Sequence, residues 1–245
     1  MSVRKFYIRY REDMPETEMQ FSALYGFGQR GVETAPFYGF GDIQELNDLG
    51  PEVGLAGYLG DVWEALSKLG FEKPASLDYP EELKKYLGRE IWQTDLKTVR
   101  GITHRKLFVK PVKQKLFTGF QMTGSFNDQM RMCGIEDNEV MWLSEPVEFV
   151  SEYRCFVLRN KIVAVHHYKN DWSKAIDKNI VQQAVDDYAV NAPAAYGIDF
   201  GVTSDGKTLL VEVNDSYALG TYGLLPNLYA QMLEARWEEL TSCLV

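Results

Sequence analysis

The residues best suited to chemistry lie in the stretch GIDFGVTSDGKTLLVEVN, near the end of the 245-residue chain. Two strand-like runs flank the dipeptide Asp205-Gly206, and an Asp-Gly pair between apolar runs is a strong signal for a β-hairpin. If these two residues alone form the loop, Asp199 lies directly opposite Glu212. The sequence therefore predicts two carboxylates side by side on neighbouring strands.

Side chains on a strand alternate between two faces, so this register places Asn214 on the side that carries Asp199 and Glu212. The same register places Gly201 opposite Leu210 on the neighbouring strand. The other side is apolar and must be the buried one; its members are Ile198, Phe200, Val202, Leu209, Val211 and Val213. A slip of one residue would move Asp199 to the apolar side, so the prediction depends on the turn.

Two like charges on directly opposed strand positions destabilise a hairpin unless a cation lies between them. Asp199, Glu212 and Asn214 offer hard oxygen ligands, which suit Mg²⁺ or Mn²⁺. Because Mg²⁺ takes only one or two carboxylates and completes its shell with water and phosphate oxygens, this set indicates a metal that binds together with a nucleotide. The alternative is a solvated acidic face whose charges tolerate each other.

Two basic residues could supply the positive charge that a nucleotide needs. Lys110, in KLFVKPV, lies on a short strand and could contact a phosphate as a point charge, although most lysines on edge strands are solvated. Arg154 belongs to a predicted hairpin that turns near Arg159-Asn160, and its planar fork matches phosphate or carboxylate oxygens. The alternative for Arg154 is a surface pair with Glu152, which would contribute little.

Other classes of active site find little support. The chain has no G-x-x-x-x-G-K-[ST] phosphate loop and no H-R-D or D-F-G set, which argues against P-loop ATPases and protein kinases. His166 and His167 are adjacent, so on a strand they point to opposite faces and cannot share a metal. With only three histidines in the chain, a Ser–His–Asp or Cys–His mechanism is also disfavoured.

The elements that must position these residues fall into two regions. Residues 1–100 alternate between strand-like and helical patterns, which predicts a small α/β domain, and the polar, basic segment 93–106 is predicted to be a connection. Residues 101–245 form the second predicted domain, of α+β class with an antiparallel sheet. Its β-rich runs are interrupted by a helix over 179–190 and followed by a last helix over 226–240.

Composition limits the partners and the setting. A formal net charge of −9 repels phosphate backbones, so we expect no nucleic-acid binding through the general surface. The three cysteines, Cys133, Cys155 and Cys243, are widely spaced, which predicts reduced and mostly buried thiols rather than disulfides or zinc. No signal peptide or membrane-length apolar run is present. We therefore expect a cytoplasmic protein with no membrane partner.

The order of these features resembles the ATP-grasp superfamily of carboxylate–amine ligases. The matching elements cover about residues 104–225 and occur in the order of the family: the Val-Lys-Pro strand, the hinge SEPVEFV, the hairpin EYRCFVLRNKIVAV, a helix, GIDFGV and LLVEVN. The chain is most similar to ribosomal-protein glutamate ligases and to small ATP-grasp proteins of phages and bacteria. The resemblance implies an ATP-grasp fold, of antiparallel sheet plus helices, preceded by a small α/β domain.

The resemblance also implies roles for residues. Lys110 would contact ATP phosphates, Arg154 would hold a phosphate or an acyl phosphate, and Asp199, Glu212 and Asn214 would bind one or two magnesium ions. The remaining nucleotide contacts would come from the hinge and its neighbours: Glu145, Val147 and Glu148 for adenine, Glu152 near the ribose, and Lys115 with Thr118 and Gly119 as the nearest match to the glycine-rich lid.

The implied activity is an ATP- and Mg²⁺-dependent ligase that joins a carboxylate to an amine through an acyl phosphate, on an amino acid, a peptide or a protein. Two alternatives remain: a phosphotransferase on the same fold, and a non-catalytic nucleotide-binding module. The sequence departs from the family in two places. The glycines of the family's lid are not obvious in this chain. The segment NDSYALG replaces the small-residue loop that usually follows the metal-binding asparagine, and we expect this segment to border the acceptor pocket.

Overall fold

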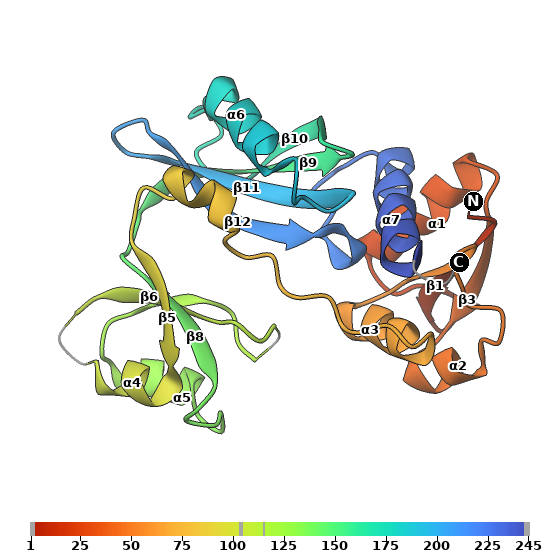
Figure 1. Cartoon of the computed structure of the whole chain (residues 1–245), viewed down its shortest axis with the longest axis horizontal. Coiled ribbons are helices and arrows are strands. Elements are labelled where there is room, and N and C mark those ends of the chain that lie inside the picture. The colour runs from red at the N-terminus through yellow and green to blue at the C-terminus, as the bar shows by residue number, and fades with distance from the viewer. Residues whose placement is uncertain (1–2, 103–104, 115, 243–245) are drawn as a thin grey trace.

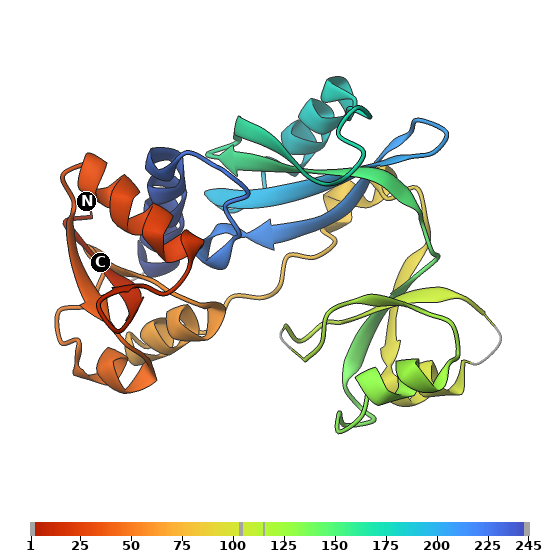
Figure 2. The same ribbon diagram turned by 180° about the vertical axis from the view of Figure 1, so that it is seen from behind.

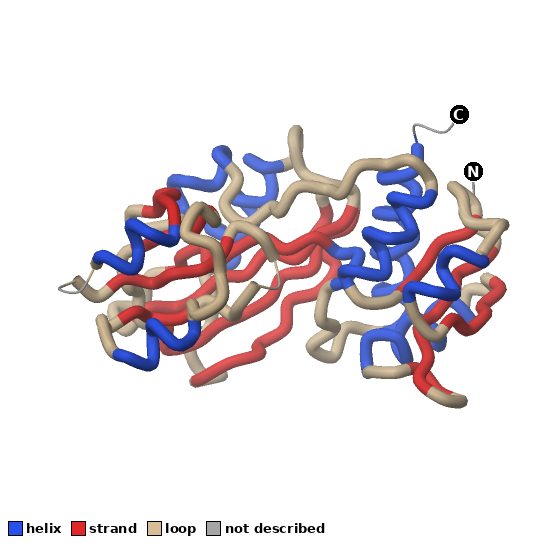
Figure 3. Tube along the Cα trace, turned by 90° about the horizontal axis from the view of Figure 1, so that it is seen from below, coloured by secondary structure: helices blue, strands red, loops and turns tan. Residues whose placement is uncertain are grey.

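The computed structural model describes residues 3–102, 105–114 and 116–242. Within these residues the strands form three four-stranded sheets, one after another along the molecule (Figures 1 and 2). Seen from below, the first sheet and its helices lie at one end and the other two sheets extend away from it (Figure 3).

The first sheet builds a small α/β unit, as predicted. Its parallel strands are β1 (Lys5–Arg11), β3 (Glu33–Phe37) and β4 (Val53–Ala56), with the short antiparallel β2 (Met14–Pro15) at one edge. The helices of the unit are α1 (Glu18–Gln29), α2 (Phe40–Glu45) and α3 (Leu59–Lys68). Parallel strands need crossover connections, and helices between the strands supply them here.

The last helix of the chain, α7 (Pro226–Thr241), packs mainly on α1 of this first unit and has a smaller contact with the third of the three sheets (Figure 1). Phe6 of β1 stacks on Phe27 of α1 with ring centres 4.1 Å apart, and Trp237 of α7 lies at 6.4 Å from Phe6. The Trp237 indole N–H donates to the Gly50 carbonyl at 2.9 Å. The two ends of the chain therefore share one hydrophobic core.

The contact between α1 and α7 gives a stability test. A Cβ on Gly26 would lie 2.0 Å from the Pro226 carbonyl oxygen, whereas a Cβ on Gly28, in the same helix, would meet nothing within 4 Å. Gly26→Ala is expected to lower the unfolding free energy by about 1–3 kcal/mol through overpacking. Gly28→Ala is expected to raise it by about 0.5–1 kcal/mol, as alanine does in a helix interior. Urea unfolding measures both, and equal effects would contradict this packing.

The second sheet contains strands on both sides of residue 100. Its order is β5-β8-β6-β7, all antiparallel, with β5 (Ile91–Asp95), β6 (Leu107–Pro111), β7 (Phe120–Met122) and β8 (Val140–Ser144). The short helices α4 (Leu96–Gly101) and α5 (Phe126–Arg131) belong to this unit (Figure 1). A core of its own holds it together.

The prediction that residues 93–106 form a plain connection was wrong. The Asp95 side chain accepts a hydrogen bond from the Thr98 N–H at 2.7 Å and so caps α4, whose Leu96 and Val99 are fully buried. β5 pairs with β8 more than forty residues later, so no local hairpin signal marked it. The boundary at residue 100 stays a prediction; because β5 belongs to the second sheet, we propose an earlier one, within residues 71–80.

The third sheet has the order β10-β9-β11-β12 and is antiparallel throughout. Its strands are β9 (Phe149–Leu158), β10 (Lys161–Asn170), β11 (Ala195–Thr203) and β12 (Thr208–Asp215). The helix α6 (Lys178–Tyr188) and the 3₁₀ helix η1 (Glu81–Tyr86) cover one face, and the 3₁₀ turn η2 (Ser216–Ala218) follows β12. The predicted hairpin turn at Arg159 and Asn160 is confirmed; both have positive φ, of 48° and 61°.

The predicted pairing of Asp199 with Glu212 is confirmed, although the turn differs from the prediction. The Thr203 N–H donates to the Lys207 carbonyl at 2.9 Å, so three residues form the loop instead of two. The resulting shift makes Gly201 face Leu209, not Leu210.

A β-bulge at Val211 reverses that shift. Between the Phe200–Leu210 pair and the Asp199–Glu212 pair, β12 contains one extra residue. The bulge also changes which side chains are buried: Leu210 is fully buried, while Leu209 is not and Val211 faces a cleft. The prediction that Leu209 and Val211 belong to the buried face was therefore wrong.

Candidate active site

A cleft of about 1230 Å³ lies between the second and third sheets. Strands of both sheets line it, together with the segment 214–220 and Leu59 of the N-terminal unit. Ligand pockets usually measure about 300–1,000 Å³, so this cleft has room for a nucleotide and part of a second ligand.

On the third-sheet wall, Arg154 and Asp199 form a buried, bidentate ion pair. They are direct neighbours on β9 and β11, and Arg154 Nε and Nη2 donate to the two Asp199 oxygens at 2.8 and 2.7 Å. Arg154 is 6 % exposed and Asp199 is 1 % exposed. Burial raises the pKa of Asp199 to about 6, and Arg154 opposes the rise, so this carboxyl is ionised at neutral pH.

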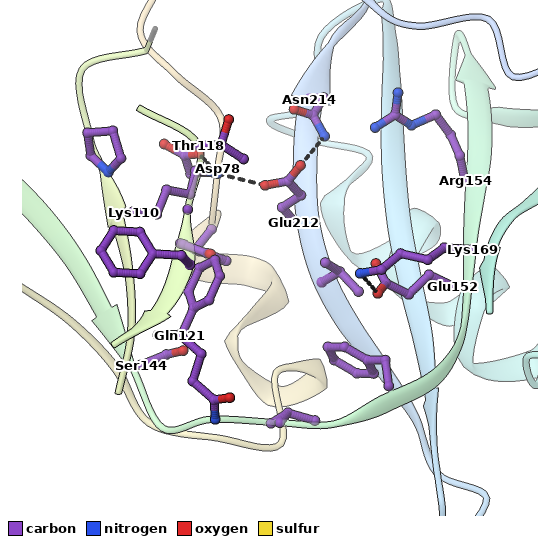
Figure 4. A pocket seen from close by; sticks show the side chains of 18 of the residues that line it. Asp78, Lys110, Thr118, Gln121, Ser144, Glu152, Arg154, Lys169, Glu212 and Asn214 are labelled. Atoms are coloured by element: carbon purple, nitrogen blue, oxygen red, sulfur yellow. Dashed lines mark hydrogen bonds and ion pairs between the residues drawn. The ribbon is translucent and has the colours of Figure 1, made fainter. Parts of the chain in front are cut away.

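Lys110 reaches across the cleft from the second sheet (Figure 4). Its Nζ donates to Glu212 Oε2 at 2.7 Å and forms a second ion pair with Asp78. Burial acts to lower the pKa of Lys110, but the Glu212 and Asp78 carboxylates outweigh it and raise this pKa. Burial likewise acts to raise the pKa of Glu212, but Lys110 and Asn214 bring it below its usual range. Lys110 and Glu212 are therefore charged at neutral pH.

The third predicted oxygen ligand, Asn214, lies beside Glu212 on the same strand. Its side-chain N–H donates to Glu212 Oε1 at 3.0 Å, which leaves the amide oxygen directed elsewhere (Figure 4). No cluster of three or more His, Cys, Asp or Glu side chains that could hold a metal occurs among the described residues. The donor set of Asp199, Glu212 and Asn214 stays a prediction.

Glu152 does not pair with Arg154, so the surface-pair alternative for Arg154 was wrong. Glu152 accepts a hydrogen bond from the Tyr168 hydroxyl at 2.8 Å and forms an ion pair with Lys169 of β10 (Figure 4). The Arg154 guanidinium lies 4.7 Å from the centre of the Tyr222 ring, which stacks on Tyr168 at 4.9 Å. Two tyrosines and Asp199 thus hold the arginine in one orientation.

The predicted hinge residues Glu145, Val147 and Glu148 connect β8 to β9 and line the cleft, as do Thr118 and Gly119. The Glu145 N–H donates to the Glu90 carbonyl at 3.2 Å, whereas no hydrogen bond joins the Val147 N–H to another described residue. Lys115 lies outside the residues that the structure describes.

Sequence reasoning missed three charged residues of this site: Asp78, Arg89 and Lys169. Arg89 donates to the Leu210 and Val211 carbonyls at 2.7 and 3.2 Å and so holds the bulge. Asp78 precedes η1, far from any motif, and Lys169 follows two histidines on an edge strand. Local pattern gave no signal for them, because each acquires its role from partners far away in the sequence.

Of the three cysteines, which were predicted to be mostly buried, Cys155 is buried, Cys133 is exposed, and Cys243 lies outside the described residues. None of the helices described is long and apolar enough to cross a membrane.

The arrangement of two antiparallel sheets around one charged cleft is that of an ATP-grasp protein. The family model for the ATP-grasp domain, R-two-K clade family 2, matches residues 86–232, well over half of the chain. The protein belongs to this family. No curated protein sequence matches the chain.

Solved ATP-grasp structures share this fold. The D-alanine–D-alanine ligase of Bacillus anthracis with ATP has a TM-score of 0.59 and 15% identity, and the match covers 99% of this chain and 98% of that one. The ATP-grasp ligase PsnB with a minimal precursor has a TM-score of 0.56 and 14% identity, covering 96% and 100%. The N5-carboxyaminoimidazole synthase of Aspergillus clavatus has a TM-score of 0.58 and 13% identity, covering 96% and 77%. At these sequence identities, the similarity shows a shared fold.

Proposed function

We propose that the protein is an ATP- and Mg²⁺-dependent ligase that joins a carboxylate to an amine on an amino acid, a peptide or a protein. The observation that carries this proposal is the meeting of Lys110 and Arg154 with Glu212 and Asn214 at one cleft between two sheets, where Asp199 is buried and paired with Arg154. The membership of the chain in an ATP-grasp family supports it. The ligase names of the similar structures agree with it.

The nucleotide would lie between the two sheets. The backbone of Glu145, Val147 and Glu148 would contact the adenine, and Glu152 would lie near the ribose. Lys110 would neutralise charge on the phosphates. Lys115, Thr118 and Gly119 would belong to the lid over the nucleotide.

The donor set fits a magnesium ion chemically. Asp199, Glu212 and Asn214 offer oxygen ligands; Glu212 and Asn214 line the cleft, whereas Asp199 is buried with both oxygens bound to Arg154. These residues would hold the ion, which would supply positive charge to the transferring phosphoryl group.

The proposed reaction has two steps. A substrate carboxylate oxygen attacks the γ-phosphorus of ATP, which forms an acyl phosphate and releases ADP. The amine nitrogen then attacks the acyl carbon, which forms the amide and releases phosphate and a proton. Arg154, with Nε and Nη2 bound to Asp199, would direct its remaining Nη1 to the acyl phosphate; this atom lies near Gly220, which lines the cleft. Positioning and charge neutralisation would supply most of the catalysis.

A substrate screen tests this function. The wild-type protein is incubated with ATP, Mg²⁺ and sets of amino acids and peptides, and phosphate release is followed with mass spectrometry of the products. Phosphate release that requires both a carboxylate and an amine, with an amide product, is the expected result. A stable phosphorylated product would instead indicate a phosphotransferase, and ATP binding without any turnover would indicate a non-catalytic module.

A further inference from the structure

Asp78 lies where the chain crosses from the N-terminal unit to the second sheet, and its backbone is held against the third sheet. The Val213 N–H donates to the Asp78 carbonyl at 2.9 Å, as an isolated β-bridge to the edge of β12. Asp78 is only 5 % exposed, and its φ of 37° is unusual for a residue other than glycine. A strained, buried, charged residue in a connection is a candidate for a functional role.

The Asp78 carboxylate is fixed in the cleft by two side chains of the second sheet. One oxygen pairs with Lys110, and the other accepts a hydrogen bond from the Trp142 indole N–H at 3.3 Å. The neighbouring Tyr79 packs edge-on against Trp142 at 5.1 Å, and Lys110 lies 5.4 Å from the centre of the Tyr79 ring. Asp78 therefore holds the same Lys110 ammonium that Glu212 binds (Figure 4).

Lys110 thus contacts two carboxylates, Asp78 and Glu212, although one would neutralise it. Since Lys110 is shared, the carboxylates in direct contact with its ammonium carry one more charge than it can neutralise, and Glu212 does not form an exclusive pair with it. If Asp78 were absent, Lys110 and Glu212 would form a neutral one-to-one pair, and a metal ion would have to break that pair to reach Glu212.

We propose that Asp78 is a positioning residue: it keeps Lys110 in place for the phosphates and leaves Glu212 available to the metal ion. This inference rests on the proposed function, since it concerns the same nucleotide site. The competing explanation is that Asp78 only anchors the connection to β12, a task that its backbone carbonyl performs whatever the charge of the side chain.

Asp78→Asn separates the two explanations. Asparagine tolerates positive φ and keeps an oxygen for Lys110 or Trp142, but it removes the charge. ATP binding is measured by calorimetry over a range of Mg²⁺ concentrations. The Mg²⁺ concentration for half-maximal ATP binding is expected to rise about tenfold, which corresponds to about 1.4 kcal/mol. ATP binding without Mg²⁺ is expected to be unchanged or tighter, because a negative charge has been removed.

Asp205→Asn is the matched control, because it removes an aspartate that pairs with a lysine, Lys207, at an exposed turn outside the cleft. It is expected to leave the Mg²⁺ requirement unchanged. If Asp78→Asn fails to fold, Asp78→Gly removes the same charge and suits the positive φ, and it is expected to give the same shift.

The outcomes are distinguishable. If the wild type shows Mg²⁺-dependent ATP binding and the folded Asp78 variant binds with the same Mg²⁺ requirement, the positioning role is overturned and the proposed function stands. If Asp205→Asn shows the same shift as Asp78→Asn, the effect is one of overall charge, and the positioning role is again overturned. If the wild type shows no Mg²⁺-dependent ATP binding, both the proposed function and this inference fail.

Discussion

Glu212→Gln is expected to reduce ATP-dependent product formation by at least about 10²- to 10³-fold, comparable to the loss of one major charge-stabilising group in other active sites. The substitution keeps the size of the side chain and its bond to Asn214, but it removes a charged metal ligand and the ionic partner of Lys110. Product formation is measured by mass spectrometry with the substrates found in the screen.

The same variant has a readout that needs no turnover. A ligand at about 100 times its Kd stabilises a folded protein by about 2.7 kcal/mol, so ATP with Mg²⁺ should raise the wild-type melting temperature. Glu212→Gln is expected to lose most of the Mg²⁺-dependent part of that rise. Glu139→Gln is a suitable control, because Glu139 pairs with Lys113 outside the cleft. An unchanged magnesium effect in Glu212→Gln would refute the proposed metal site.

Arg154→Met is expected to lower the unfolding free energy by about 3–5 kcal/mol, because it leaves the Asp199 carboxylate buried without its partner. Methionine is apolar and of similar length, which limits the contribution of an empty cavity. Urea unfolding measures the change in the absence of nucleotide.

A double variant distinguishes the lost ion pair from lost packing. Arg154→Met combined with Asp199→Leu removes both charges, and it is expected to recover most of the stability, since apolar replacements of buried ion pairs are often neutral or stabilising. Both variants are expected to be inactive, because the anion-binding guanidinium is gone. A single variant as stable as the wild type would show that the pair contributes little to the fold.

Much of the site could be predicted from the sequence because it depends on local order. The alternation of β11 and β12 placed Asp199, Glu212 and Asn214, and the Asp205-Gly206 pair located the hairpin. The pairing of Asp199 with Glu212 was right although the loop is one residue longer than predicted, because the bulge at Val211 adds a compensating residue. Turn residues signal where a chain reverses, but they do not determine how many residues the reversal takes.

Long-range partners could not be predicted in the same way. Nothing in KLFVKPV indicates that Lys110 meets Glu212 and Asp78, and nothing near residue 226 indicates that α7 packs on α1. The strand β5 could not be predicted for the same reason, since two other strands, β6 and β7, lie between β5 and its partner β8 in the sequence.

The sequence by itself determined many of the elements, the family resemblance and the oxygen-rich face of the last hairpin, because periodicity and turn chemistry act over a few residues. Only the tertiary structure determined which charged residues form ion pairs with one another. Arg154 binds Asp199 and Lys110 lies between Asp78 and Glu212 because two sheets and the segment before η1 meet at one cleft. Ion pairs depend on distance and burial in the folded chain, and separation along the sequence determines neither.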